Sequence, residues 1–375
     1  MDRSDLEYKQ SVDCIAYLCG CAVKGIVPDL GRVLSVNLDS LFEVSGKHML
    51  SAMVGRILQD NGVSTPSFKN AISLAQRKAV ILNHDLKSIV SALEETGIWY
   101  MPLKGAILKE YYPRFAMREM CDRDILFDAS RADDVKAIME GLGFATKEFG
   151  ISADDVYQKP PVSNIEMHRE LFGSYQKENL HEYYRDVKSR LIKVDDSDYE
   201  YRFTPEDFYI YMVAHEYKHY SLSGTGLRSL LDTYVFLKNA QINMEYVKEE
   251  VEKLGIAEFE QKNRSLSIAL FDGKELTEVD RDMLEYIMSS GTYGSIQNKV
   301  INRLNGNSGS KLKYLVRRIF GPGRKDRDRE HFEKTYAIFF KHKVLLPLLP
   351  FYRFIRAFTK SPSRIKNETD VLRNA

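Results

Sequence analysis

Hydrophobic residues in the first quarter of the chain recur at three- and four-residue steps, which is the period of an amphipathic helix. The stretch from 68 to 97, FKNAISLAQRKAVILNHDLKSIVSALEETG, shows the pattern most clearly. Its apolar positions fall on one face: Ile72, Ala75, Ala79, Leu82, Leu86, Ile89 and Leu93. Gly97 follows the last of them, and a glycine commonly ends a helix. We therefore predict a helical region over residues 1–95.

The period changes after Gly97, where short apolar runs alternate with turns and short helices. Strands are expected where charged and apolar residues alternate, or where an apolar run ends at a turn residue. The four candidate strands are IWYMPLKG (98–105), DRDILF (122–127), FATKEF (144–149) and NIEMHREL (164–171), and the two candidate helices are AILKEYYP (106–113) and SRADDVKAIMEGLG (130–143). This order predicts a small mixed α/β unit.

Helical periodicity returns after residue 204 and continues toward the C-terminus. The stretch TPEDFYIYMVAHEYKHYS begins with Thr204 as a cap and Pro205 at the first helical position. The predicted fold class is therefore α+β, with a small mixed-sheet core embedded between helical regions. The predicted divisions are an N-terminal helical region (1–95), the α/β core (96–195), a C-terminal helical domain (196–320), and a linker with an apolar, basic tail (321–375).

The tail has a composition of its own. Residues 336–358, YAIFFKHKVLLPLLPFYRFIRAF, are apolar and aromatic, with Lys and Arg among them. Pro347 and Pro350 interrupt the run, so it is not expected to span a membrane. We expect the tail either to dock on the rest of the protein or to make an interfacial contact with a membrane or a partner.

Composition narrows the function classes. The 375 residues carry 54 Lys and Arg against 53 Asp and Glu, so no overall positive field indicates a general nucleic-acid-binding protein. The four cysteines form no C-x-x-C pair, and three of them lie in the first apolar segment, where buried free thiols are expected. No signal peptide and no apolar run of membrane-spanning length is recognised, so we expect a cytoplasmic protein.

Candidate metal chemistry lies in the stretch MPLKGAILKEYYPRFAMREMCDRDILF. Residues i and i+2 of a strand point to the same side, so Asp122 and Asp124 would share a face. Two adjacent carboxylates suit Mg²⁺, which takes oxygen ligands from carboxylates and from substrate phosphates. Glu166 would supply a third acid from another strand, with His168 on the same face. Taken alone, a D-x-D pattern is also typical of a solvated strand end.

A second pattern, H-E-x-x-H, is spelled by His215, Glu216 and His219. On a helix this spacing places two histidines on one face and is the mark of a zinc protease. A charged residue, Lys218, stands between Glu216 and the second histidine, and Leu222 replaces the glycine of one extended form of the motif. No third ligand is evident, although a zinc site needs three. We therefore interpret the pattern as accidental and do not predict a zinc metalloprotease.

Three separated motifs together resemble the bacterial "uncharacterised nucleotidyltransferase" family, a branch of the nucleotidyltransferase superfamily with a DNA polymerase beta-like fold. They are Leu103-Lys104-Gly105-Ala106, Arg118-Glu119-Met120-Cys121-Asp122-Arg123-Asp124-Ile125-Leu126 and Glu166-Met167-His168. The resemblance extends from about residue 65 to about residue 300 and includes Lys218-His219 and the helix with Leu227, Arg228 and Asp232. The superfamily's usual Gly-Ser turn is Gly105-Ala106 here, so a phosphate-binding serine is missing.

The resemblance implies roles for these residues. The nucleotide's phosphates would lie at Lys104, Gly105 and Arg118, and Mg²⁺ or Mn²⁺ would be held by the catalytic acids Asp122, Asp124 and Glu166. The residues implied to contact substrate are His168, Lys218, His219, Arg228 and Asp232. The implied reaction moves a nucleoside monophosphate from a nucleoside triphosphate to a hydroxyl-bearing acceptor, which can be a small molecule, a sugar or a macromolecule. The alternative is a catalytically degenerate member that binds a nucleotide or a partner as a regulatory module, which Ala106 favours.

Overall fold

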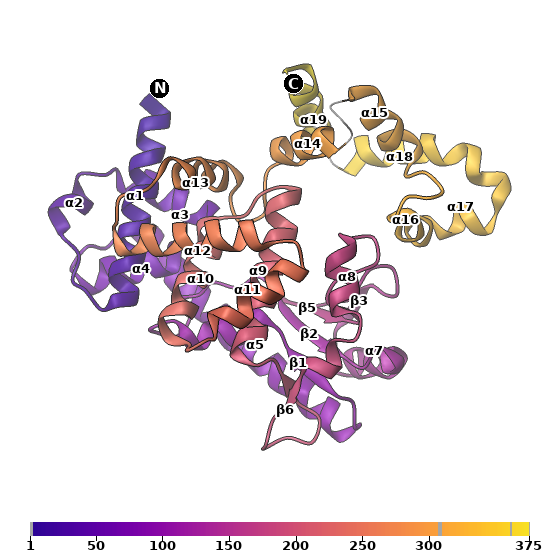
Figure 1. Cartoon of the computed structure of the whole chain (residues 1–375), viewed down its shortest axis with the longest axis horizontal. Helices are drawn as coiled ribbons and strands as arrows, with labels where there is room; N and C mark the ends of the chain where they lie inside the picture. The colour runs from indigo at the N-terminus through magenta and orange to yellow at the C-terminus, as the bar shows by residue number, and fades with distance from the viewer. Residues whose placement is uncertain (1–2, 307–309, 361, 375) are drawn as a thin grey trace.

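The structure is a computed structural model and describes residues 3–306, 310–360 and 362–374. A small sheet lies among helices, so the fold is α+β, as the sequence predicts (Figure 1). The helices before the sheet are α1 (Arg3–Lys24), α2 (Leu30–Leu34), α3 (Leu38–Lys47), α4 (Ser51–Asp60) and α5 (Pro66–Glu95). The sheet region contains β1 (Tyr100–Pro102), α6 (Lys104–Leu108), β2 (Arg123–Phe127), α7 (Ala132–Gly141), β3 (Ala145–Glu148), β4 (Asp154–Lys159), β5 (Ser163–His168) and α8 (Glu178–Tyr184).

A short hairpin and a long helical part follow the sheet. The hairpin strands are β6 (Ile192–Lys193) and β7 (Tyr201–Arg202). The helices are α9 (Pro205–Leu222), α10 (Leu227–Asn239), α11 (Met244–Lys253), α12 (Ala257–Asp272), α13 (Glu278–Ser290), α14 (Ile296–Gly306), α15 (Lys311–Phe320), α16 (Arg329–Thr335), α17 (Ala337–Lys341), α18 (Leu349–Lys360) and α19 (Pro362–Asn374). Four short 3₁₀ segments are η1 (Lys109–Tyr111), η2 (Ala129–Arg131), η3 (Val187–Arg190) and η4 (Lys343–Leu348).

The main sheet is mixed and has the strand order β1-β2-β5-β4-β3. β2 and β5 are parallel, whereas the other neighbouring pairs are antiparallel. One face is apolar, because Ile125 of β2 and Ile165 and Met167 of β5 are fully buried against side chains of α5 and α7. Arg123 also points to this side and donates a hydrogen bond to Asn83 of α5. The polar residues that alternate with these side chains are thereby left on the opposite face.

Local signals explain where the long helices begin and end. The Thr65 side chain caps α5 with Pro66 at the first position, and Gly97 just beyond the helix has a positive φ of 67°. The Thr204 side chain accepts a hydrogen bond from the Asp207 amide and caps α9. Within the main sheet, the hydrophobic pattern does not predict the strand β4, because its Asp155 is fully buried and paired with Arg169 (2.8 Å).

Helices from both ends of the chain share one hydrophobic core. Buried residues of α1 and α4 pack with those of α9, α10 and α12, and Figure 1 shows α1–α4 beside α10, α12 and α13. A methyl group added at Gly20 of α1 would lie 2.5 Å from the Phe271 carbonyl oxygen of α12, so only glycine permits this close contact. Cys14, Cys19 and Cys21 are buried free thiols in the same core, as predicted. The division of the chain into four units stays a prediction.

The last helices, α14–α19, gather apart from this core (Figure 1). A small cluster of Val300, Leu304 and Tyr314, with Val371 and Leu372 packed against it, holds α14, α15 and α19 together. Among the helices that the structure describes, none combines the length and apolar character needed to cross a membrane.

Candidate functional site

Two acids meet at the polar face of the sheet. β2 and β5 are paired in register so that Asp124 lies directly beside Glu166 and Leu126 beside His168. Neighbouring residues in register on parallel strands point to the same face, which confirms the expectation that Glu166 faces the same way as Asp124. The Asp124 side chain is 16% exposed and the Glu166 side chain 30%, so both remain open to a ligand.

His168 completes a compact cluster with these acids. Its Nε2 lies 3.6 Å from Asp124 Oδ1 and 3.9 Å from Glu166 Oε2, and one ligand atom of each residue lies within 4.8 Å of the others. Within the described residues this is the one group of three or more His, Cys, Asp or Glu side chains that is close enough to hold a metal ion. His168 is buried, yet neither of its ring nitrogens has a hydrogen-bond partner.

The electrostatics of the cluster follow from its crowding. Burial, together with the charges of Asp124 and Asp122, raises the pKa of Glu166 to about 7. Burial by itself would raise the pKa of Asp124, but the contact with His168 outweighs it and the pKa is lowered. Burial would lower the pKa of His168, but its contact with Asp124 raises it overall. A cation in the cluster would relieve the repulsion between the two carboxylates.

Two further acids border the cluster. Asp122 lies one residue before β2, outside the compact group; burial and the charge of Asp124 raise its pKa, and Arg228 opposes the rise. Asp154 of β4 lies opposite His168 in register and so on the same face of the sheet. Sequence reasoning missed Asp154. The signal would have been an alternation of polar and apolar residues along DDVYQK, the sequence of β4. The buried Asp155 obscures this alternation, because it places a charged residue at an inward position.

The turn between β1 and α6 brings Lys104 toward α9. Lys104 Nζ lies 2.7 Å from His215 Nδ1, a contact between residues 111 positions apart that the sequence does not reveal. Burial lowers the pKa of Lys104 to about 8. Gly105 has no positive φ, and a methyl group added there would make only ordinary contacts, the nearest at 3.5 Å from Arg118 Nη1. The backbone of the turn therefore does not require a glycine.

Arg118 and Asp232, both implied to contact the nucleotide or substrate, bind one another. Nε and Nη2 of Arg118 donate to the two carboxylate oxygens of Asp232 at 2.7 and 2.8 Å, and the Tyr112 hydroxyl donates to Asp232 Oδ1 at 2.7 Å. Both residues of the pair are buried. Arg228 of α10 donates to the Glu119 carbonyl at 2.7 Å. These bonds attach the loop before β2 to α10. The same loop leads directly to Asp122 and Asp124, so the bonds help to fix the position of these two acids.

The helix α9 presents its histidines and its glutamate in different directions. The rings of His215 and His219 lie 4.6 Å apart, and Lys104 occupies Nδ1 of His215. Glu216 is buried and accepts a hydrogen bond from Asn263 of α12 at 3.1 Å. No third ligand joins the two histidines among the residues that the structure describes. The two histidines and Glu216 thus make contacts of their own on α9, and the interpretation of the H-E-x-x-H pattern as accidental stays a prediction.

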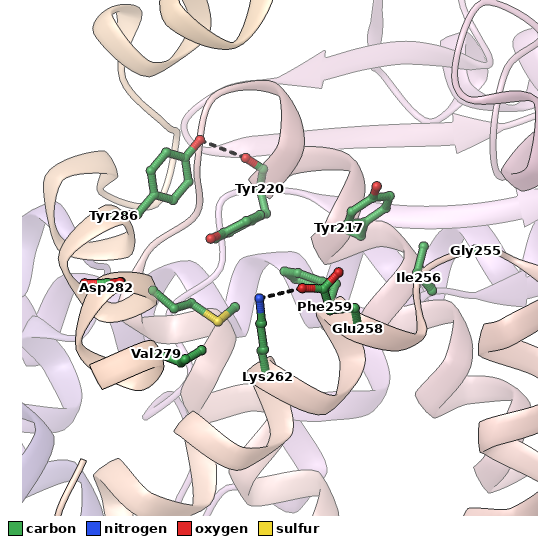
Figure 2. Close-up of a pocket in the computed structure, with 11 residues that line it drawn as sticks. Tyr217, Tyr220, Gly255, Ile256, Glu258, Phe259, Lys262, Val279, Asp282 and Tyr286 are labelled. Carbon is green, nitrogen blue, oxygen red and sulfur yellow. Dashed lines mark hydrogen bonds and ion pairs between the residues drawn. The ribbon is translucent and has the colours of Figure 1, made fainter. Parts of the chain in front are cut away.

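An aromatic pocket of about 480 Å³ lies on another side of α9 (Figure 2). Tyr217 and Tyr220 line it from α9, Phe259 and Lys262 from α12, and Tyr286 from α13. The Tyr286 hydroxyl donates to the Tyr220 carbonyl at 2.9 Å, and Lys262 pairs with Glu258. Asp124, Glu166 and His168 do not line this pocket, so the pocket and the acidic cluster are separate sites.

Comparison with known proteins identifies the family. A family described as "Uncharacterised nucleotidyltransferase" matches residues 35–272, a span that holds the five-stranded sheet, the cluster and α9 and α10. The match begins and ends earlier than the span over which the motifs resemble the family. No curated protein and no solved structure matches the chain. Because the match covers well over half of the 375 residues, the chain belongs to the uncharacterised nucleotidyltransferase family.

Proposed function

We propose that the protein is a metal-dependent nucleotidyltransferase that moves a nucleoside monophosphate from a nucleoside triphosphate to a hydroxyl-bearing acceptor. The observation that carries the proposal is the register of β2 and β5, which sets Asp124 beside Glu166 with His168 next to both. Membership of a nucleotidyltransferase family supports the transferase class.

A divalent cation, Mg²⁺ or Mn²⁺, fits the residues of the cluster. Asp124 and Glu166 supply hard oxygen ligands, and the unpartnered ring nitrogens of the buried His168 are free to bind a metal. Imidazole suits transition metals better than it suits Mg²⁺, so this mixed set favours Mn²⁺. Asp122, next to the cluster, is the candidate for a further ligand. Bound metal would neutralise the charge of the triphosphate and lower the pKa of an acceptor hydroxyl.

Cationic side chains around the acids would bind and orient the triphosphate. Lys104 at the β1–α6 turn, Lys218 on α9 and Arg228 on α10 each act electrostatically on Asp122 or Asp124. Their positive charge suits phosphate groups placed beside the acids. The exposed His219 next to Lys218 is a candidate contact for the acceptor.

The proposed reaction is an in-line displacement at the α-phosphorus. The acceptor oxygen forms a bond to phosphorus, the bond from phosphorus to the bridging oxygen breaks, and pyrophosphate leaves. The acceptor proton passes to Glu166 or to solvent. The pKa of Glu166 is about 7 without a bound cation, and a cation that relieves its repulsion from Asp124 would lower this pKa and keep the carboxylate ionised.

A second candidate function is a nucleotide-binding regulatory module without catalysis. Two observations favour it: Ala106 stands where a phosphate-binding serine is usual, and Lys104 is already hydrogen-bonded to His215. Both functions predict nucleotide binding, but only the enzyme releases pyrophosphate. Pyrophosphate release from each nucleoside triphosphate, with Mn²⁺ or Mg²⁺ and a cell extract as the source of acceptor, therefore separates them. Tight binding of a nucleotide without release would favour the module.

A further inference from the structure

The near-neutral charge of the whole chain hides an uneven distribution. Residues 311–375 carry 17 Lys and Arg against 6 Asp and Glu, whereas residues 1–310 carry 37 against 47. The C-terminal helices are therefore strongly basic, and the remainder of the chain is acidic. A charge asymmetry of this kind indicates a partner for the basic end that carries negative charge.

The same helices expose an unusual amount of apolar surface. Thirteen of the 24 large hydrophobic side chains that are exposed in the described residues lie between 312 and 358. The exposed fractions reach 73% for Leu312, 70% for Ile338, 89% for Val344 and 69% for Phe351. So many exposed apolar side chains within one short part of the chain indicate an interaction site rather than ordinary solvent-exposed surface.

An apolar groove of about 640 Å³ runs between α15, α18 and α19. Its walls include Ile319 and Phe320 of α15 and Phe351, Phe354 and Phe358 of α18. The Arg353 side chain lies at the groove and donates to the Ile319 carbonyl at 2.7 Å. Apolar walls next to arginine suit a ligand with a hydrocarbon part and an anionic part.

The basic residues stand beside the apolar ones along the chain. Lys311 and Lys313 flank Leu312 on α15, and Lys341 and Lys343 precede Val344; all four lysines are exposed. Helices that combine exposed aromatic and aliphatic side chains with Lys and Arg lie in the interface of anionic membranes.

Other occupants of this surface fit less well. Two copies of the chain that met through this same face would bring equal excesses of positive charge together, which opposes a symmetric contact. A nucleic acid would satisfy the lysines and arginines, but it offers no contact for exposed aliphatic side chains such as Val344 and Ile338. An anionic phospholipid surface satisfies both the charge and the apolar groups.

We propose that residues 311–360 and 362–374 form an interfacial anchor, here named the C-terminal anchor, that binds the surface of an anionic phospholipid bilayer. The exposed apolar side chains enter the boundary of the acyl chains, and the lysines and arginines bind the headgroups. The anchor contacts the sheet region through His331 of α16. The centroids of the His331 and Tyr175 rings lie 4.6 Å apart, and His331 Nδ1 lies 3.2 Å from the Ile151 carbonyl oxygen. Membrane binding would thus hold the Asp124–Glu166–His168 cluster near the lipid surface.

Co-sedimentation of the full-length protein with vesicles tests the proposal. One set of vesicles contains phosphatidylcholine alone, and the other contains phosphatidylcholine mixed with phosphatidylglycerol. We expect binding to the mixed vesicles only, weakening as salt rises, because the headgroup contacts are electrostatic. Each basic residue near an anionic surface contributes about fivefold in affinity, so Lys341→Glu with Lys343→Glu should weaken binding by more than about twentyfold.

Matched substitutions separate the anchor from nonspecific hydrophobicity. Val344→Asp changes an exposed valine of the anchor (89%), and Val27→Asp changes one of the acidic part of the chain (76%). We expect a loss of vesicle binding for Val344→Asp and none for Val27→Asp, with unchanged thermal unfolding for both. Equal binding to both kinds of vesicle, or no binding to either, would overturn the proposal. A dimer abolished by Val344→Asp in the absence of lipid would assign the surface to a second copy instead.

Discussion

His168 is buried next to two carboxylates, and neither ring nitrogen makes a hydrogen bond. If this side chain binds a metal, His168→Ala should weaken Mn²⁺ binding by at least about tenfold and Mg²⁺ binding much less. Calorimetric titration with each ion measures both affinities. His84→Ala, an exposed histidine of α5, is the control and should change neither affinity. Equal losses of Mn²⁺ and Mg²⁺ affinity in His168→Ala would argue against direct ligation.

Lys104 carries its charge only below its lowered pKa of about 8. Because the charged form attracts phosphates, triphosphate affinity should be full near neutral pH and fall as the pH rises through about 8. Lys104→Met should lose most of the affinity together with this pH dependence. Fluorescence titration with a labelled nucleotide across the pH range checks both effects. An unchanged pH profile in Lys104→Met would remove Lys104 from the phosphate site.

Burial of Glu216 makes the unfolding free energy of the protein depend on pH. Its ordinary pKa of 4.5 is raised to about 7 by burial, so the folded protein binds more protons than the unfolded chain between these values. Stability should therefore decrease as the pH rises from 4.5 to about 7. Glu216→Gln should be nearly neutral at the acidic end and stabilising by on the order of 2 kcal/mol above pH 7. Urea unfolding at both pH values measures the difference, and an effect of equal size at both would contradict the explanation.

At the scale of elements, one buried ion pair holds the loop before β2 to α10. Arg118→Met would leave Asp232 charged and buried without its partner, which should cost about 3–5 kcal/mol of unfolding free energy. Arg114, four residues earlier, pairs with Asp60 at 2.7 Å but is largely exposed, and Arg114→Met should cost less than about 1 kcal/mol. Chemical denaturation of both variants compares the two pairs. Similar losses of unfolding free energy in the two variants would mean that burial adds little to the stabilisation by the Arg118–Asp232 pair.

The elements that bear the acids were predictable from the sequence because their side chains alternate cleanly. Ile165 and Met167 are buried and Glu166 is not, so periodicity alone gives the face of β5. β4 was missed because a buried ion pair, Asp155 with Arg169, places a charge where the pattern requires an apolar residue. The contact of Lys104 with His215 depends on how α9 packs across the sheet. The pattern of hydrophobic and polar residues along the chain does not show that packing.

At the scale of the whole molecule, three parts with different surfaces are joined. The helices of both halves share one core, the sheet presents its acids toward α9, and the C-terminal anchor is basic and apolar. The net charge of the whole chain does not indicate the basic character of the C-terminal anchor, because 54 basic and 53 acidic residues nearly cancel. The sequence predicted an apolar, basic tail, but only the structure reveals how much of its apolar surface stays exposed.

The most direct test of the central claim is transfer of label from an α-³²P-labelled nucleoside triphosphate. Purified protein, its Asp124→Asn form and its Glu166→Gln form are each incubated with every labelled nucleotide, Mn²⁺ or Mg²⁺, and a cell extract as acceptor source. The account predicts labelled product with the wild type and a loss of at least about a thousandfold in each variant, a difference of several kcal/mol in transition-state stabilisation. Transfer of label at the wild-type rate by Asp124→Asn, or no transfer by the wild type with any nucleotide, would contradict it.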